Sequence, residues 1–149
     1  MPRLYFAAPL FSAAELVFNE VLAERIEALG FEVFLPQRDG VESHREPWAS
    51  MTPEQRRRAI FELDRDQVFA CDVLLFVLDG RVPDEGAALE LGMAYAHRQL
   101  AKPGRRLVGL HTDARAAFLG AKLNPMLAVP LDAVFDDADA LLGYLAGIR

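Results

Sequence analysis

The chain has 149 residues, of which 52% are hydrophobic and 26% are charged, and its formal net charge at pH 7 is -6. These values fit a single domain over residues 1–149 with a substantial core, and they exclude an intrinsically disordered chain. The negative charge and the lack of a clustered basic face argue against a nucleic-acid-binding protein. No apolar stretch is long enough to span a membrane, so no membrane partner is expected.

The cysteine content and the N-terminus predict a compartment. Cys71 is the single cysteine, which excludes an internal disulfide. The chain enters a strand-like segment at once, without a basic region, a long apolar segment and a cleavage site. We therefore expect a cytoplasmic protein.

Short apolar runs that end at Pro, Gly or Asp are typical of buried β-strands. They occur at residues 4–8, 31–35, 72–78, 107–110 and, more briefly, 133–135. The segments between them have helical spacing, and helix start and stop signals accompany them. These signals are two capping boxes, a glycine stop and an aspartate cap for the last helix: Ser12 with Glu15, Thr52 with Gln55, Gly30 and Asp136.

The alternation of strands and helices predicts an α/β fold with a doubly wound parallel sheet of about five strands and helices on both faces. A flavodoxin-like strand order, 2-1-3-4-5, places the switch point between the first and third strands. The carboxyl ends of these two strands then face one cleft, with residues 5–10 on one side and residues 79–90 on the other.

The segment at residues 37–51 is polar and long for a connection in so small a domain. Long loops are often functional or mobile. Trp48 is its one large aromatic residue. Two interpretations stand equally: a lid that closes over a ligand, or a local anchor.

Asp64 is an unusual residue in the helix that follows. It falls within an apolar stripe that is expected to face the core, formed by Ile60, Phe61, Leu63, Val68 and Phe69. An unpaired carboxylate in such a stripe costs several kcal/mol, on the order of 2–7, unless it is hydrogen-bonded or neutralised. Asp64 either bonds a backbone amide or borders a polar pocket, and the acids expected nearby favour the pocket.

Glu90 lies inside the helix that follows the third strand. Because helical side chains tilt toward the N-terminus, its carboxylate is expected over Gly86 and Ala87, which leave open space. No Lys or Arg occurs from residue 84 to residue 96, which suggests a helix packed closely on most sides. This environment favours a functional glutamate over a solvated surface residue.

The candidate cleft is rich in acids and lacks other catalytic signatures. There is no dinucleotide fingerprint, P-loop, zinc motif or serine nucleophile elbow. Carboxylates around one cleft can divide acid and nucleophile roles, as in the cleavage of glycosidic bonds. The candidate acids are Asp64, Asp79, Asp84, Glu85 and Glu90.

Several motifs together resemble the nucleoside 2-deoxyribosyltransferase family. They are YFAAPLFS at residues 5–12, LPQRDG at 35–40, FELD at 61–64, DEGAALELGMA at 84–94 and NPM at 124–126. The similarity covers most of the chain in order.

The resemblance implies a double displacement. Glu90 matches the nucleophile that attacks C1′ of a 2′-deoxynucleoside, and a second base then restores the β configuration. Tyr5 matches the residue that orients this nucleophile. Asp64 and Asp84 match acids that contact the base or sugar, one of which carries the proton of the base.

The resemblance also implies the remaining binding residues and the partners. Gln37 and Asp39 match binding positions, and Asn124 matches a residue donated from a neighbouring subunit to the 5′ end of the sugar. Asp79 and Gly86, beside the catalytic acids, are further candidate binding positions. The family implies a homo-oligomer built from dimers, with a 2′-deoxynucleoside and a free nucleobase as partners and no metal or organic cofactor.

Two other functions compete with this interpretation. A hydrolase of the same superfamily splits 2′-deoxynucleoside 5′-monophosphates and needs a phosphate pocket near the first loop, where only Ser12 can contribute. A non-catalytic nucleotide-binding module would retain its function after Glu90→Gln.

Overall fold

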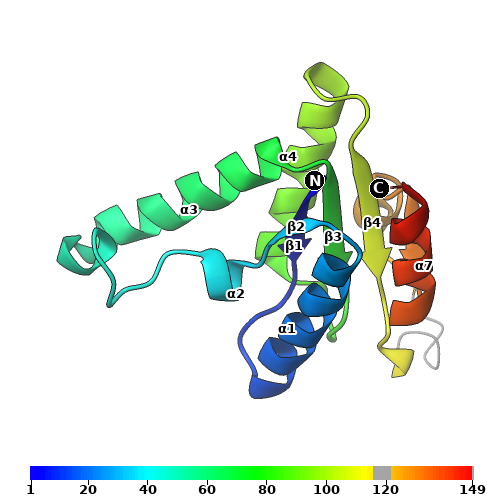
Figure 1. Cartoon of the computed structure of the whole chain (residues 1–149), viewed down its shortest axis with the longest axis horizontal. Coiled ribbons are helices and arrows are strands. Elements are labelled where there is room, and N and C mark those ends of the chain that lie inside the picture. Colours follow the sequence, from blue (N-terminus) through cyan, green and yellow to red (C-terminus); the bar gives the residue numbers. More distant parts are fainter. Residues whose placement is uncertain (116–121, 149) are drawn as a thin grey trace.

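The computed structural model describes residues 1–115 and 122–148. Its sheet has the strand order β2-β1-β3-β4-β5 with every neighbouring pair parallel, which confirms the predicted flavodoxin-like topology (Figure 1). The strands are β1 (Arg3–Ala7), β2 (Glu32–Phe34), β3 (Val73–Val77), β4 (Arg106–Leu110) and β5 (Ala133–Phe135). The helices are α1 (Ala13–Ala28), α2 (Pro36–Asp39), α3 (Pro53–Ala70), α4 (Glu85–Leu100), α6 (Pro125–Ala128) and α7 (Ala138–Ile148).

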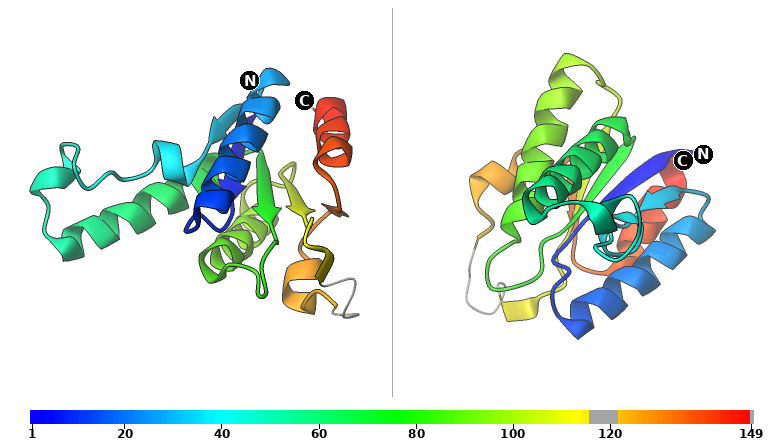
Figure 2. Two further views of the ribbon diagram at one scale, coloured as in Figure 1. Left: turned by 90° about the horizontal axis from the view of Figure 1, so that it is seen from below. Right: turned by 90° about the vertical axis from the view of Figure 1, so that its left-hand side faces the viewer.

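Two hydrophobic layers lie on opposite faces of the sheet. Helices α1 and α7 cover one face, and α3 and α4 cover the other (Figure 2). Side chains of β1 alternate between the layers, with Leu4 and Phe6 toward α1 and Tyr5 toward α4. The central strand β3 is buried along its whole length, as expected for a strand covered on both sides.

The predicted helix signals are confirmed except at the last helix. Both capping boxes are present, and Gly30 follows α1 with a φ of 94°. The last helix is capped by Asp137, whose Oδ1 accepts from Ala140 N at 2.8 Å. The prediction of Asp136 was wrong by one residue because α7 begins at Ala138.

The segment at residues 37–51 is more ordered than the predicted loop. Pro36 opens the short helix α2, since proline suits the first helical position as well as the end of a strand. A 3₁₀ helix spans Trp48–Ser50, and Arg56 Nε donates to the carbonyl of Trp48 at 3.3 Å. This contact ties the segment to the start of α3 through the main-chain carbonyl of Trp48, and the choice between a lid and a local anchor stays open.

Helices α3 and α4 are less buried than the sequence suggested. Val68 is the buried residue of α3, whereas Ile60 and Phe61 are 41% and 49% exposed. The N-terminal half of α3 extends beyond the sheet, so no core lies beneath it (Figure 1). The buried residues of α4 lie on one face, and Leu89 is 57% exposed. The predictions of a core-facing stripe on α3 and of close packing around α4 were therefore wrong for a single copy of the chain.

Across residues 1–115 and 122–148, no helix is long and apolar enough to cross a membrane.

Candidate active site

A hydrogen bond between Tyr5 and Glu90 lies at the centre of the candidate site. Tyr5 Oη donates to Glu90 Oε1 at 2.7 Å, which joins β1 to α4. Tyr5 is fully buried, and its ring stacks on Phe34 of β2 with a centroid distance of 5.6 Å and an interplanar angle of 17°. The position of the phenol is therefore fixed by the strand and by the ring beside it.

Burial raises the pKa of Glu90 to about 7, and the charges of Asp64 and Asp84 act in the same direction. The hydrogen bond from Tyr5 opposes this rise by stabilising the carboxylate. The pKa of Tyr5 is far above its usual value of 10.0, mainly through burial and also because of the charges of Glu90 and Asp64. Tyr5 is thus a neutral donor at physiological pH, and Glu90 ionises near neutrality.

Asp64 of α3 completes the cluster from the neighbouring helix. Its side chain is half-buried, and burial raises its pKa to about 6. Within the described residues its carboxylate accepts no hydrogen bond, so it does not act as a helix cap. The alternative of a capping aspartate is therefore wrong, and the charge of Asp64 acts on Tyr5 and Glu90, while a polar pocket beside it stays a prediction.

Asp84 and Gly86 lie at the start of α4. Asp84 is the N-cap residue, and its Oδ2 accepts from Ala87 N at 2.9 Å. A Cβ atom at Gly86 would lie 3.1 Å from Asp84 Oδ2, so a side chain there would crowd this cap. Asp84 therefore has a structural task in addition to its charge, which raises the pKa of Glu90.

Asp79 has a different environment from the one predicted. Its carboxylate accepts from Thr112 N at 2.6 Å, from Thr112 Oγ1 at 2.5 Å and from Asp113 N at 3.0 Å. These bonds join the loop after β3 to the loop after β4. Both oxygens are engaged, and the structure does not bring Asp79 to Tyr5 and Glu90.

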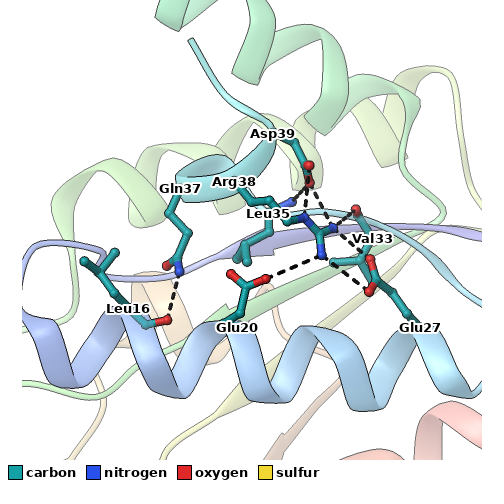
Figure 3. A network of polar contacts seen from close by, with 8 residues as sticks. All are labelled: Leu16, Glu20, Glu27, Val33, Leu35, Gln37, Arg38 and Asp39. Carbon is teal, nitrogen blue, oxygen red and sulfur yellow. Dashed lines mark hydrogen bonds and ion pairs between the residues drawn. The ribbon is translucent and has the colours of Figure 1, made fainter. Parts of the chain in front are cut away.

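Gln37 also has structural partners on both sides of its amide. Its Nε2 donates to Leu16 O at 2.8 Å, and its Oε1 accepts from Asn19 Nδ2 at 3.0 Å. The side chain points toward α1 (Figure 3), whereas Glu90 lies on the opposite face of the sheet. The predicted substrate contact by Gln37 would require this side chain to leave α1.

Asp39 protects the free edge of the sheet. Glu32 N donates to Pro2 O at 3.0 Å, on the side of β1. Because backbone N–H and C=O groups alternate in direction along a strand, those of Val33 and Leu35 point away from β1. Leu35 N donates to Asp39 Oδ2 at 2.8 Å, and Arg38 Nη2 donates to Val33 O at 3.1 Å (Figure 3). Such capping satisfies edge groups that would otherwise be free to pair with another strand.

Asn124 caps the short helix α6, where its Oδ1 accepts from Met126 N at 2.9 Å. It is exposed and lies beside a cavity of about 210 Å³ at the end of β3. No contact joins it to Tyr5 or Glu90 of the same chain.

The structure brings together four of the nine predicted site residues: Tyr5, Asp64, Asp84 and Glu90. Gly86 adjoins Asp84, and the other four have the separate environments above. Two residues near the site were not predicted from the sequence: Phe34, which stacks on Tyr5, and Arg105, a buried cation. No group of three or more His, Cys, Asp or Glu side chains suited to a metal occurs within residues 1–115 and 122–148.

Replacing Tyr5 by phenylalanine is expected to raise the pKa of Glu90 above its value of about 7, because the hydrogen bond that stabilises the carboxylate is lost. A ¹³C titration of the glutamate side-chain carboxyl carbons measures this shift without any assay of activity. Phe34→Leu is the control, since it removes the stacked ring and keeps the hydroxyl. A lower pKa in Tyr5→Phe would contradict the role assigned to the bond.

The fold and this cluster define a parallel α/β protein of flavodoxin-like strand order, with a half-buried glutamate held by a tyrosine. Residues 4–140 match the family model for nucleoside 2-deoxyribosyltransferase, and the chain belongs to this family. The resemblance carried by the sequence motifs is therefore confirmed.

Two solved structures share the architecture over the whole chain. A conserved protein from Enterococcus faecalis V583 is 29% identical, with a TM-score of 0.77 and coverage of 100% of this chain and 99% of that one. A 2-deoxyribosyltransferase from Bacillus psychrosaccharolyticus is 22% identical, with a TM-score of 0.76 and coverage of 99% and 96%, and this likeness shows the fold. Comparison with curated proteins gave no match.

Proposed function

We propose that the protein transfers the 2-deoxyribosyl group between nucleobases through a covalent glycosyl-enzyme on Glu90. The observation that carries this proposal is the 2.7 Å hydrogen bond from Tyr5 to Glu90 Oε1, which holds the carboxylate beside two further acids. The family match supports the class of substrate.

The first half-reaction forms an ester. The Oε2 atom of Glu90 attacks C1′ of the sugar, and the C1′–N bond breaks with its electron pair on the leaving base. Tyr5 holds the other oxygen and keeps the carboxylate in line, a positioning effect that can contribute several kcal/mol, on the order of 7–11 in the best cases. In the second half-reaction an acceptor base attacks C1′ from the vacated side, the ester breaks, and the β configuration is restored.

Asp64 is the better candidate to carry the proton of the base. Its raised pKa of about 6 lets it hold a proton near neutral pH, and no described residue donates a hydrogen bond to it. Asp84 is already engaged by Ala87 N as the helix cap. We therefore assign protonation of the leaving base and deprotonation of the acceptor to Asp64.

A second copy of the chain is proposed to complete the site with Asn124, in a homo-oligomer built from dimers. Met126 and Val129, close to Asn124 in sequence, are 79% and 76% exposed. Such exposed apolar side chains suit a contact with another subunit. The reaction proposed here uses only groups of the protein and its substrates.

The hydrolase alternative is disfavoured by the loop after β1. Phe11 N and Ser12 N donate to Glu15 Oε2 at 3.0 and 2.7 Å. These bonds lower the pKa of Glu15, so its carboxylate occupies the donors that a phosphate would use. This supports a nucleoside over a 5′-monophosphate.

The test is a chromatographic assay with 2′-deoxyinosine and free adenine, beside 2′-deoxyinosine alone. We expect 2′-deoxyadenosine in the first tube only. Equal release of hypoxanthine in both tubes would indicate hydrolysis. The proposal would be overturned if the protein formed no exchanged nucleoside and released no base from either purine or pyrimidine deoxynucleosides.

The reaction is expected to have a bell-shaped dependence on pH. Attack needs ionised Glu90, whose pKa is about 7, and protonation of the base needs neutral Asp64, whose pKa is about 6. The profile of kcat/KM should therefore fall on both sides of a maximum between these two values. Initial rates in buffers of constant ionic strength measure it, and a flat profile from pH 5 to 8 would contradict the assignment.

A further inference from the structure

A buried arginine joins the two helices that carry the acids. Arg105, in the turn before β4, is 1% exposed. Its guanidinium donates from Nη2 to Phe69 O at 2.6 Å, from Nε to Cys71 O at 3.1 Å and from Nη1 to Ala94 O at 3.2 Å. It makes no salt bridge within the described residues. The carboxylate of Asp72 attracts its charge, but its hydrogen bonds within the described residues all go to backbone carbonyls, which is unusual for a buried cation.

Capping of α3 explains only part of this arrangement. The last carbonyls of a helix lack intrahelical partners and attract cations. Lys102 Nζ already serves this purpose by donating to Ala70 O at 2.6 Å. The third bond of Arg105 goes to Ala94, inside α4, where the carbonyl is expected to accept from the amide four residues later. That bond therefore connects α3 to α4 rather than completing a helix end.

A second contact lies at the same place, the joint between α3 and α4. The rings of Phe69 of α3 and His97 of α4 stack with a centroid distance of 4.6 Å and an interplanar angle of 13°. The guanidinium and this ring pair together fix where the two helices cross.

We propose that Arg105 is a positioning residue for the reaction: by clamping α3 to α4 it fixes the separation of Asp64 and Glu90. The inference rests on the proposed function of these two acids. Only arginine offers a planar fork of N–H groups that can serve three carbonyls in different directions; a lysine ammonium is a single point of charge.

The acids are close to the joint along each helix. Ala94 is one turn after Glu90, an axial distance of about 6 Å, and Phe69 is five residues after Asp64, about 7.5 Å. A rotation of about 10° at the joint therefore displaces each carboxylate by about 1 Å, and misplacement of this size can lower a rate by about 100-fold.

The experiment compares Arg105→Lys and Arg105→Gln with two controls. Arg106→Lys changes the exposed neighbour. Lys102→Met removes the hydrogen bond from Lys102 to Ala70 O but leaves the bond from Arg105 to Ala94 O. All variants are assayed below their melting temperatures, with folding checked by circular dichroism. For both Arg105 variants we expect kcat to fall by about 10- to 100-fold and KM to change by less than about threefold. Lys102→Met should lower the melting temperature and leave kcat unchanged.

A titration separates failure of the clamp from failure of the proposed function. The groups that face Glu90 are Tyr5 from β1, Asp64 from α3 and Asp84 at the start of α4. If the clamp loosens, Asp64 and Glu90 move apart, and the ¹³C-detected pKa of Glu90 should fall even in an enzyme that shows no transfer, because the charge of Asp64 contributes to raising it. A folded Arg105→Lys protein with wild-type kcat and unchanged carboxyl titration would overturn the proposal.

Discussion

Replacing Glu90 by glutamine is expected to lower the rate of base exchange by about 10⁴-fold, which corresponds to about 5.5 kcal/mol of transition-state stabilisation. The amide cannot form the glycosyl ester, so both half-reactions stop. The measurement is the rate of 2′-deoxyadenosine formation, together with the intact mass of the protein after mixing with 2′-deoxyinosine. Wild-type protein should gain the mass of a deoxyribosyl group, and the variant should not.

Glu85→Gln is the matched control, since Glu85 is an exposed glutamate in the first turn of the same helix. It should retain wild-type rates. If Glu90→Gln kept more than about a tenth of the activity, the covalent mechanism would be wrong, since loss of a nucleophile costs far more than this.

The same substitution is expected to stabilise the fold at alkaline pH. The pKa of Glu90 is about 7 in the folded protein and 4.5 ordinarily, so the folded state binds more protons between these values. The free energy of unfolding therefore decreases as the pH rises from 4.5 to about 7. Glutamine removes this penalty, and Tyr5 can still donate to its carbonyl. Denaturant unfolding should show a gain of about 1–3 kcal/mol at pH 8 and none at pH 4.

Opposed trends in activity and stability are what distinguish a site glutamate from a solvated one. Under the proposed mechanism, Glu90 occupies a half-buried position because its carboxylate is needed for the reaction, and not because it stabilises the fold. The sequence already indicated an unusual environment, since the residues on either side of Glu90 in that helix are Gly, Ala, Leu and Met.

Local patterns predicted the framework because each has a local physical cause. The buried run of β3 follows from its apolar pattern, and both capping boxes follow from bonds within a few residues. The strand order was predicted from the fold class that alternating strands and helices define. The placement of Tyr5 against Glu90 follows from topology, because β1 and β3 are neighbours and α4 packs over them.

Other features of the structure were not predicted because the surroundings of a side chain depend on how the elements pack. Asp39 and Gln37 resemble binding residues in sequence, but their bonds go to the edge of β2 and to α1. The position of Arg105 gives no sequence signal, since its three carbonyl partners lie 11 to 36 residues away. The stripe on α3 has helical period, but its first half extends past the sheet that it was expected to cover.

The substitution Asp64→Asn is expected to lower kcat for an ordinary purine deoxynucleoside by about 10²- to 10³-fold. This range is typical of the contribution of a general acid. In the first half-reaction, followed as release of the base, the loss should largely disappear with 7-methyl-2′-deoxyguanosine, whose base leaves as a neutral molecule without a proton from the enzyme. Rates with the two substrates, measured side by side, report this difference. The alkaline decline of the pH profile should also vanish, because it reflects the ionisation of Asp64, while dependence on Glu90 ionisation stays.

Asp84→Asn is the comparison that decides between the two acids. Asparagine caps a helix about as well as aspartate, so the bond from Ala87 N and the stability should be retained. The variant removes one of the charges that raise the pKa of Glu90, so its pH profile should shift slightly to lower pH with kcat reduced by less than about tenfold. If Asp84→Asn instead showed the larger loss, rescued by the methylated substrate, the proton would belong to Asp84. Asp64 is the preferred candidate because burial raises its pKa to about 6 and no described residue donates a hydrogen bond to it, whereas the carboxylate of Asp84 is engaged by Ala87 N.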